Sequence, residues 1–129
     1  AHVPEELDLE RMRRGASSLG GEHDFAALSS AQRTSKTSVR TIYEVKIFRD
    51  DGDEKVVHIE VTGNGFLYNM VRIITGTLTE VGLGRRRPQE LAGILASRDR
   101  QQAGHTAPAA GLYLVEVYYD EQRQAEAER

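Results

Sequence analysis

The sequence predicts one α+β domain, in which helices pack on one face of an antiparallel or mixed sheet in the order α-β-β-α-α-β. Apolar residues alternate along residues 39–49 and 55–62 with a turn-forming run between them, which predicts a strand pair. Apolar residues recur every three or four positions after that pair, which predicts a central helix. The 129 residues suit one compact domain, 1–119, and a polar tail, 120–129.

A first helix is expected over Pro4–Leu19, because its apolar residues lie loosely along one face and acidic residues suit its first turn. A double glycine ends it, and Phe25 is expected to anchor the next loop to the core. In that loop His23 adjoins Asp24. A structural loop is favoured over an acid–base pair, since adjacent side chains rarely face each other. Polar residues 29–38 predict a surface loop.

The first strand is expected over Val39–Arg49, with a hairpin at residues 50–53 and a return strand over Lys55–Thr62. The inward face is expected to hold Val39, Thr41, Tyr43, Val45, Ile47, Val57, Ile59 and Val61. His58 is expected to face outward. The second face is expected to hold the apolar residues Ile42, Phe48, Leu112, Leu114 and Tyr118. An apolar second face suggests a cover, which is another domain, another subunit or a stacked base.

The stretch Gly63–Gly84 joins a glycine turn to a nearly apolar helix that carries one arginine, Arg72. The buried stripe is expected to comprise Leu67, Met70, Val71, Ile74, Leu78 and Val81. Arg72 is expected on a different face, shared with Asn69, Thr75 and Thr79. A guanidinium stays charged in a protein, so beside a core it needs an anion. That anion is a carboxylate of this chain, a phosphate, or a group on another chain.

A second helix is expected over Gln89–Ser97 and a last strand over Leu112–Tyr119. Three arginines directly follow the central helix, where they suit the negative end of the helix dipole or a phosphate. The formal net charge is −3, but the acidic residues gather at the hairpin and the two ends. The central body is therefore mildly basic and able to attract phosphate.

The composition argues against several classes of protein. The absence of cysteine excludes disulfides and thiolate metal sites and fits a reducing cytoplasm. No apolar run is long enough to predict a membrane span, and no secretory signal is visible. The four histidines are scattered, so no metal site is expected. The chain begins at Ala1 without methionine, and we expect it to be a processed or truncated piece of something longer.

Two long motifs, GFLYNMVRIITGTLTEVGLGRR and DRQQAGHTAPAAGLYLVEVYY, closely resemble the C-terminal half of the tRNA pseudouridine synthase A family. The stretches GEHDF and SVRTIYEVKI resemble that family's preceding segments, so the resemblance covers residues 5–119. It implies half of a pseudouridine synthase fold. It also implies an enzyme that isomerises uridine to pseudouridine in the tRNA anticodon stem-loop without a cofactor. Homodimerisation in the cytoplasm, with no membrane association, is expected.

The family's essential aspartate lies in its N-terminal half, within an Arg-Thr-Asp-type motif that this sequence lacks. The resemblance therefore implies that Arg72 pairs with the catalytic aspartate of the N-terminal half and that this chain is inactive alone. It assigns the substrate-binding wall of the cleft to Phe66, Leu67, Tyr68 and Leu112. Contacts with tRNA phosphates are expected from Arg85, Arg86, Arg87, Arg98 and Arg100.

Two other hypotheses stay open, a non-catalytic RNA-binding module and a dimerisation domain. Both would gain if Arg72 bonded to an Asp or Glu of this chain, whereas the half-enzyme predicts an exposed or solvent-paired Arg72 in a groove. A module that stacks bases needs aromatic residues on an open strand face. Tyr43, Tyr113 and Tyr119 are expected to face inward, which counts against it.

Overall fold

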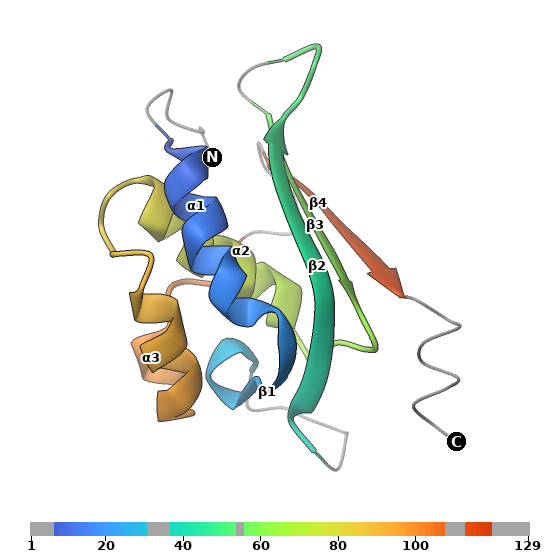
Figure 1. Ribbon diagram of the computed structural model, residues 1–129, viewed down its shortest axis with the longest axis vertical. Coiled ribbons are helices and arrows are strands. Elements are labelled where there is room, and N and C mark those ends of the chain that lie inside the picture. The colour runs from blue at the N-terminus through green and yellow to red at the C-terminus, as the bar shows by residue number, and fades with distance from the viewer. Residues whose placement is uncertain (1–6, 31–36, 54–55, 108–112, 120–129) are drawn as a thin grey trace.

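The computed structural model describes residues 7–30, 37–53, 56–107 and, for the backbone, 113–119 (Figure 1). The elements, with η marking 3-10 turns, are α1 (Leu9–Ala16), η1 (Ser17–Leu19), β1 (Gly21–Asp24), η2 (Ala26–Leu28), β2 (Val39–Arg49), β3 (Val57–Gly63), α2 (Met70–Gly82), α3 (Glu90–Ser97), η3 (Arg100–Gln102) and β4 (Tyr113–Tyr119). Helices pack on one face of a four-stranded sheet, so the predicted α+β class is confirmed.

The sheet is mixed, with strand order β1-β2-β3-β4. The first two pairings are antiparallel and the pairing of β3 with β4 is parallel. Parallel neighbours need a crossover connection, and α2 and α3 supply it. β1 is an addition to the predicted order. Its sequence GEHD has little strand propensity, and it is a strand because its backbone pairs with the start of β2.

The inward and outward faces of β2 exchange at a β-bulge. Between Ile42 and Glu44, β2 advances two residues while β3 advances one, which leaves Tyr43 as the extra residue. Ile42 is therefore buried, at 1% exposed, whereas Val39 is 39% exposed. The predictions that Ile42 faces outward and Val39 inward are wrong, because strict alternation does not allow for an inserted residue. Beyond the bulge the predicted phase holds, and Phe48 is exposed.

β3 alternates as predicted, with its inward side chains fully buried. His58 faces outward, and its ring stacks on Phe48 with centroids 4.8 Å apart. Its Nε2 lies 2.7 Å from Asp50 Oδ1 in the hairpin. This hydrogen bond from His58, and next the one from the Gly52 backbone N–H in the hairpin, lower the pKa of Asp50. The side chains of Leu114 and Tyr118, and the tail 120–129, lie outside the described residues.

The first helix begins at Leu9, later than the predicted start at Pro4. Asp8 caps it, because its Oδ1 accepts the Arg11 N–H at 3.2 Å. The predicted apolar face is confirmed, with Leu7, Leu9, Met12, Ala16 and Leu19 all buried. Phe25 is also fully buried, as expected of an anchor for its loop. α3 begins one residue later than predicted, and its apolar residues are buried.

α2 is buried on nearly every side. Its predicted stripe is confirmed, but Thr75 and Thr79, predicted to share the face of Arg72, are also buried at 0% and 2% exposed. Each hydroxyl donates to the backbone carbonyl four residues earlier at 2.8 Å, as does that of Thr77. These threonines therefore enter the core without an unsatisfied donor. In the described part of the chain, no helix combines the length and hydropathy needed to cross a membrane.

Candidate functional site

The turn from β3 into α2 is locked against β2. Asn64 donates its backbone N–H to Thr41 O at 3.0 Å, and its Oδ1 accepts the Thr41 N–H at 2.9 Å. Gly65 has a φ of +155°, which L side chains rarely adopt. The turn therefore needs glycine for backbone geometry, as predicted, and it delivers the next residues to α2 in a fixed position.

Residues 66–72 line a shallow pocket of about 360 Å³ at the start of α2. Leu67 is buried, and Phe66 packs partly buried against the core. Tyr68 is 56% exposed, and Asn69 has a left-handed backbone with φ of 58°. The pocket thus combines an apolar wall with one large exposed aromatic side chain.

Arg72 is partly buried in this pocket and is held by two acceptors. Its Nε donates to Ala107 O at 2.8 Å and its Nη1 donates to Asn69 Oδ1 at 3.2 Å. The Ala107 N–H returns a bond to Arg72 O at 2.9 Å. Among the described residues, no Asp or Glu pairs with Arg72 and its Nη2 donates no hydrogen bond. The RNA-binding and dimerisation hypotheses therefore gain no support from an internal ion pair.

The acceptor from Ala107 belongs to a segment that lies along α2, residues 103–107, which we call the docked loop. The Gly104 N–H donates to Thr77 Oγ1 at 2.9 Å, and the His105 N–H donates to a carboxylate oxygen of Glu80 at 3.0 Å. With the bonds to Arg72, these contacts hold the loop along the length of α2.

The docked loop lies this close only because α2 has a glycine in its middle. A Cβ on Gly76 would stand 1.8 Å from His105 O, well inside van der Waals contact. Any larger residue at this position would push the loop outward. The position of the Arg72 acceptor therefore depends on a residue with no side chain.

Glu80 joins the docked loop to the C-terminal end of α2. Its Oε1 accepts Arg86 Nε at 2.8 Å, and its Oε2 lies 2.8 Å from His105 Nδ1. Burial raises the pKa of this carboxyl, but hydrogen bonds from Arg86 and His105 outweigh burial and lower the pKa from 4.5 to about 2. Glu80 is therefore ionised at neutral pH and acts as a fixed anion that holds the loop.

Three of the five arginines predicted to contact tRNA already bind other parts of the chain. Arg86 is bound to the carboxylate just described, and Arg98 Nε lies 3.7 Å from Asp24 Oδ2. Arg100 donates to Thr106 Oγ1 at 3.3 Å. Their tRNA contacts stay predictions.

The remaining two, Arg85 and Arg87, are exposed, and neither side chain bonds to a described residue. Arg85, Arg86 and Arg87 follow the C-terminal end of α2, whereas Arg100 bonds to Thr106, the neighbour of the Arg72 acceptor Ala107. Residues 66–68 thus share one pocket with Arg72, and the three arginines that follow α2 lie at the other end of that helix. The substrate-binding role of residues 66–68 stays a prediction. Leu112 lies outside the described residues.

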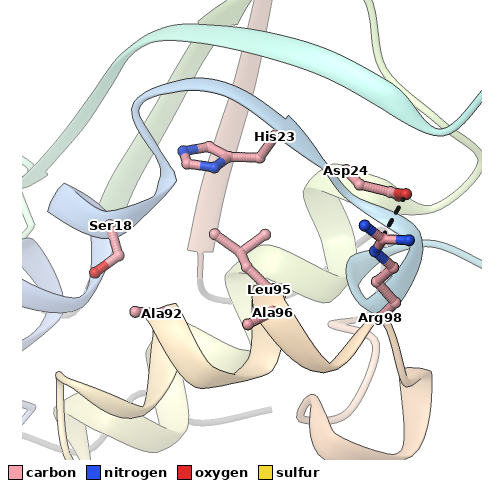
Figure 2. A pocket seen from close by; sticks show the side chains of 7 residues that line it. All are labelled: Ser18, His23, Asp24, Ala92, Leu95, Ala96 and Arg98. Atoms are coloured by element: carbon pink, nitrogen blue, oxygen red, sulfur yellow. Dashed lines mark ion pairs between the residues drawn. The ribbon is translucent and has the colours of Figure 1, made fainter.

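Figure 2 shows a second pocket, of about 420 Å³, between β1 and α3. Here His23 and Asp24 make separate contacts. His23 Nε2 is 2.8 Å from Gly20 O, whereas Asp24 Oδ1 accepts the Ala26 N–H at 3.0 Å. The Asp24 carboxylate also pairs with Arg98 in this pocket. The two side chains therefore do not bond to each other, as expected, but the predicted loop is wrong because both residues belong to β1.

Comparison with known proteins identifies the family. A family model described as tRNA pseudouridine synthase matches residues 16–120. This chain belongs to that family. Two similar proteins, each called tRNA pseudouridine synthase A, come from Acetivibrio thermocellus and Brevibacillus brevis. They are 57% and 52% identical to this chain over 118 residues, which are 92% of this chain and 47% of each relative.

A third relative, tRNA pseudouridine synthase A 2 from Clostridium tetani, is 50% identical over 119 residues. The resemblance inferred from the two long motifs is therefore confirmed at the level of the family. The chain spans about half the length of the curated relatives it matches. In the described part of the chain, no three His, Asp or Glu side chains gather where they could hold a metal ion.

Sequence reasoning missed the docked loop as part of the Arg72 environment. Two signals in the sequence point to it. Gly76 interrupts an otherwise strong helix, which indicates a close approach of backbone. Thr77 and Glu80 are polar residues on a helix that proves buried, and such groups need partners. Neither signal identifies the segment of the chain that approaches Gly76 or that supplies partners for Thr77 and Glu80.

Proposed function

We propose that this chain forms one half of the catalytic cleft of a tRNA pseudouridine synthase, which isomerises uridine to pseudouridine in the anticodon stem-loop. The observation that carries the proposal is the state of Arg72. Its own chain holds the guanidinium on two sides, yet no described carboxylate pairs with it. A charge on a mostly buried helix needs an anion, and the family's catalytic aspartate would supply it.

The reaction breaks the bond between N1 of uracil and C1′ of ribose and forms a bond between C5 and C1′. C5 loses its hydrogen as a proton and N1 gains one, so the balance needs no cofactor. In this proposal an aspartate from the part of the enzyme that this chain does not span attacks uracil C6 or ribose C1′. A nucleophilic carboxylate must be ionised, and pairing with Arg72 would keep its pKa low.

Arg72 is suited to this positioning role because its guanidinium is already oriented. Ala107 O and Asn69 Oδ1 occupy Nε and one Nη1 donor, which leaves Nη2 for the incoming carboxylate. A preoriented donor loses little freedom when the aspartate arrives. Phe66, Leu67, Tyr68 and Leu112 would form the apolar wall that dries the cleft and strengthens the ion pair.

The partners follow from the same proposal. The chain would be inactive alone and would need the N-terminal half of the same protein and a tRNA substrate. The whole enzyme would act in the cytoplasm as a homodimer. Among the arginines assigned to tRNA, Arg85 and Arg87 are the best placed to bind phosphate, because no described residue bonds to either side chain.

The test is release of tritium from a tRNA transcript whose uridines carry tritium at C5. We would compare the 129-residue chain alone with the same chain joined to the remaining half of the Acetivibrio thermocellus relative. No release from the chain alone and release from the fusion are expected. Release from the chain alone would overturn the proposal, because a nucleophile would then have to lie within it.

Variants of the fusion separate the role of Arg72 from general stability. Removing one partner of a buried ion pair costs about 3 to 5 kcal/mol, so Arg72→Ala and Arg72→Lys should lower kcat by about 100-fold to a few thousand-fold. Arg13→Lys is the matched control, since Arg13 also donates to a carbonyl, Ile47 O, at 3.0 and 2.7 Å. Its activity should stay near that of the unmodified fusion. Equal losses for Arg72 and Arg13 variants would contradict a specific role for Arg72.

A further inference from the structure

Most arginine side chains in the described part of the molecule are engaged by the chain itself. Those that donate to its oxygen atoms or pair with its carboxylates are Arg11, Arg13, Arg40, Arg49, Arg72, Arg86, Arg98 and Arg100. The side chains of Arg14, Arg85 and Arg87 make no such contact with any described residue, and all three are exposed. No contact with a described residue therefore gives these three side chains a role in holding the fold together.

Two of the three line one groove of about 520 Å³ between α1 and the connection from α2 to α3. Figure 1 shows this connection on the side of the helices away from the sheet. The residues that line the groove are Arg11, Arg14, Ser17, Ser18, Arg87, Pro88 and Gln89. The lining therefore holds three arginines and no acidic residue, with Arg14 on one wall and Arg87 on the other.

The third arginine of the groove, Arg11, holds the two walls together. Its Nε donates to Val81 O at 3.0 Å and its Nη2 donates to Arg86 O at 2.7 Å. The nearby carboxylate of Glu90 is turned to other groups, since it accepts the Arg87 backbone N–H at 2.7 Å and lies 3.9 Å from Arg86 Nη1. The spacing of the walls is thus fixed by hydrogen bonds, while no described carboxylate forms an ion pair with the Arg14 or Arg87 side chain.

We propose that this groove binds a phosphate of the RNA backbone, with Arg14 and Arg87 donating to it from opposite walls. Guanidinium groups match phosphate oxygens in charge and in the geometry of their paired donors. Like charges that face one groove repel each other, and a phosphate between them removes that repulsion. The Ser18 hydroxyl and the Gln89 amide line the same groove and add neutral donors. The inference rests on the proposed function, which supplies RNA as the ligand.

The groove and Arg72 lie near opposite ends of α2. At a rise of about 1.5 Å per residue, Arg72 lies about 15 Å along the helix from Gly82, the last residue of α2. Successive phosphates of one strand are about 3.4 Å apart along a duplex axis, so the bound phosphate belongs to a nucleotide several positions from the reacting uridine. The groove therefore positions the RNA and leaves the chemistry to the cleft.

The first measurement is the affinity of the 129-residue chain for an unmodified tRNA transcript between 50 and 200 mM salt. Each lost phosphate contact lowers the slope of log affinity against log salt by about 0.7 to 0.9, so Arg14→Gln and Arg87→Gln should each lower it by that amount. The advantage of the unmodified chain over each variant should shrink about threefold across this salt range. Both side chains are exposed and bond to no described residue, so melting temperatures should stay the same.

Lys46→Gln is the matched control. It removes the same charge from an exposed residue of β2, where Lys46 lies 3.7 Å from Glu44. The slope of this variant should equal that of the unmodified chain. The proposal is overturned if the Arg14, Arg87 double variant keeps the original slope. It is also overturned if Lys46→Gln lowers the slope as much as either arginine variant, or if the unmodified chain does not bind the transcript.

Tritium release by the fusion described above separates failure of this inference from failure of the proposed function. If both hold, the double variant of Arg14 and Arg87 raises the KM for tRNA and leaves kcat unchanged. If only the groove is wrong, the fusion is active and the double variant has an unchanged KM. If the proposed function is wrong, the unmodified fusion releases no tritium at any tRNA concentration.

Discussion

Replacing Gly76 with alanine should destabilise the protein, although alanine is the better helix former. The new Cβ would stand 1.8 Å from His105 O and 2.8 Å from its carbonyl carbon, whereas ordinary contact begins at 3.4 Å. The docked loop would have to move outward by about 1.6 Å to restore van der Waals contact. The helix backbone cannot yield instead, because α2 is buried on nearly every side.

Such a movement breaks the hydrogen bonds between α2 and the docked loop. Four of them involve the loop backbone. Two of these join Arg72 and Ala107, and two start from the N–H groups of Gly104 and His105. At about 1 kcal/mol each, losing these four costs about 4 kcal/mol, and the helix propensity of alanine returns about 1 kcal/mol. The net loss of about 3 kcal/mol corresponds to a melting temperature lower by about 10 °C for a domain of this size.

Gly93 provides the matched control, because it lies in α3 and a Cβ there would have no atom within 4 Å. Gly93→Ala should therefore stabilise the chain by up to about 1 kcal/mol and raise the melting temperature by about 3 °C. Thermal and urea unfolding, followed by circular dichroism, measure both variants. The reasoning is refuted if Gly76→Ala melts at the temperature of the unmodified chain, or if both substitutions shift it in the same direction.

Acidification should remove the folding stability that the ionised Glu80 contributes. Folding lowers the pKa of its carboxyl from 4.5 to about 2, so as the pH falls the carboxyl takes up a proton in the unfolded chain before it does so in the folded one. That stability is present above pH 4.5 and lost as the pH falls to about 2, and it amounts to at most about 3 kcal/mol. Urea unfolding of Glu80→Gln should show a shallower loss over this range, and an equally steep one would contradict the assignment. Thr77→Val should lower the free energy of unfolding by about 1 to 3 kcal/mol, because the buried Gly104 N–H loses its acceptor. Thr79→Val should change it by no more than about 0.5 kcal/mol, because the Thr79 hydroxyl bonds only to its own helix. Equal losses in the two unfolding curves would argue against the docked loop. Ile42→Ala should lower the free energy of unfolding by about 2 to 5 kcal/mol, and Val39→Ala should lower it by less than about 1 kcal/mol. A larger loss for Val39→Ala in urea unfolding would contradict the position of the bulge.

The bounds of β2 and the buried stripe of α2 were predictable because each rests on a repeat that local sequence shows directly. The bulge at Tyr43 was not, since a single extra residue leaves the apolar pattern of the strand unchanged and is defined by its partner strand. β1 was missed for a related reason. Its residues have weak strand preference, and only pairing with a distant strand makes them a strand.

The place of Arg72 on a helix beside an apolar stripe was also predictable, because a single charged residue among apolar ones stands out in the sequence. The acceptors were not all predictable. Asn69 is a local partner, three positions away, whereas Ala107 is 35 positions away and offers only a backbone carbonyl. A carbonyl belongs to every residue, so no side chain in the sequence marks it. The burial of Thr75 and Thr79 was hidden because each satisfies its hydroxyl within its own helix.

The docked loop has a consequence for the order in which the protein forms during synthesis. Arg72 leaves the ribosome after Asn69 but well before its second acceptor, because Ala107 follows 35 positions later. Until Ala107 emerges, a nascent chain holds α2 with an arginine that lacks its carbonyl acceptor. A product that terminates before residue 104 would keep the full arginine motif but not the geometry that the motif needs. The segment that follows α2 is therefore part of the site, even though it contributes a backbone carbonyl oxygen and no side chain.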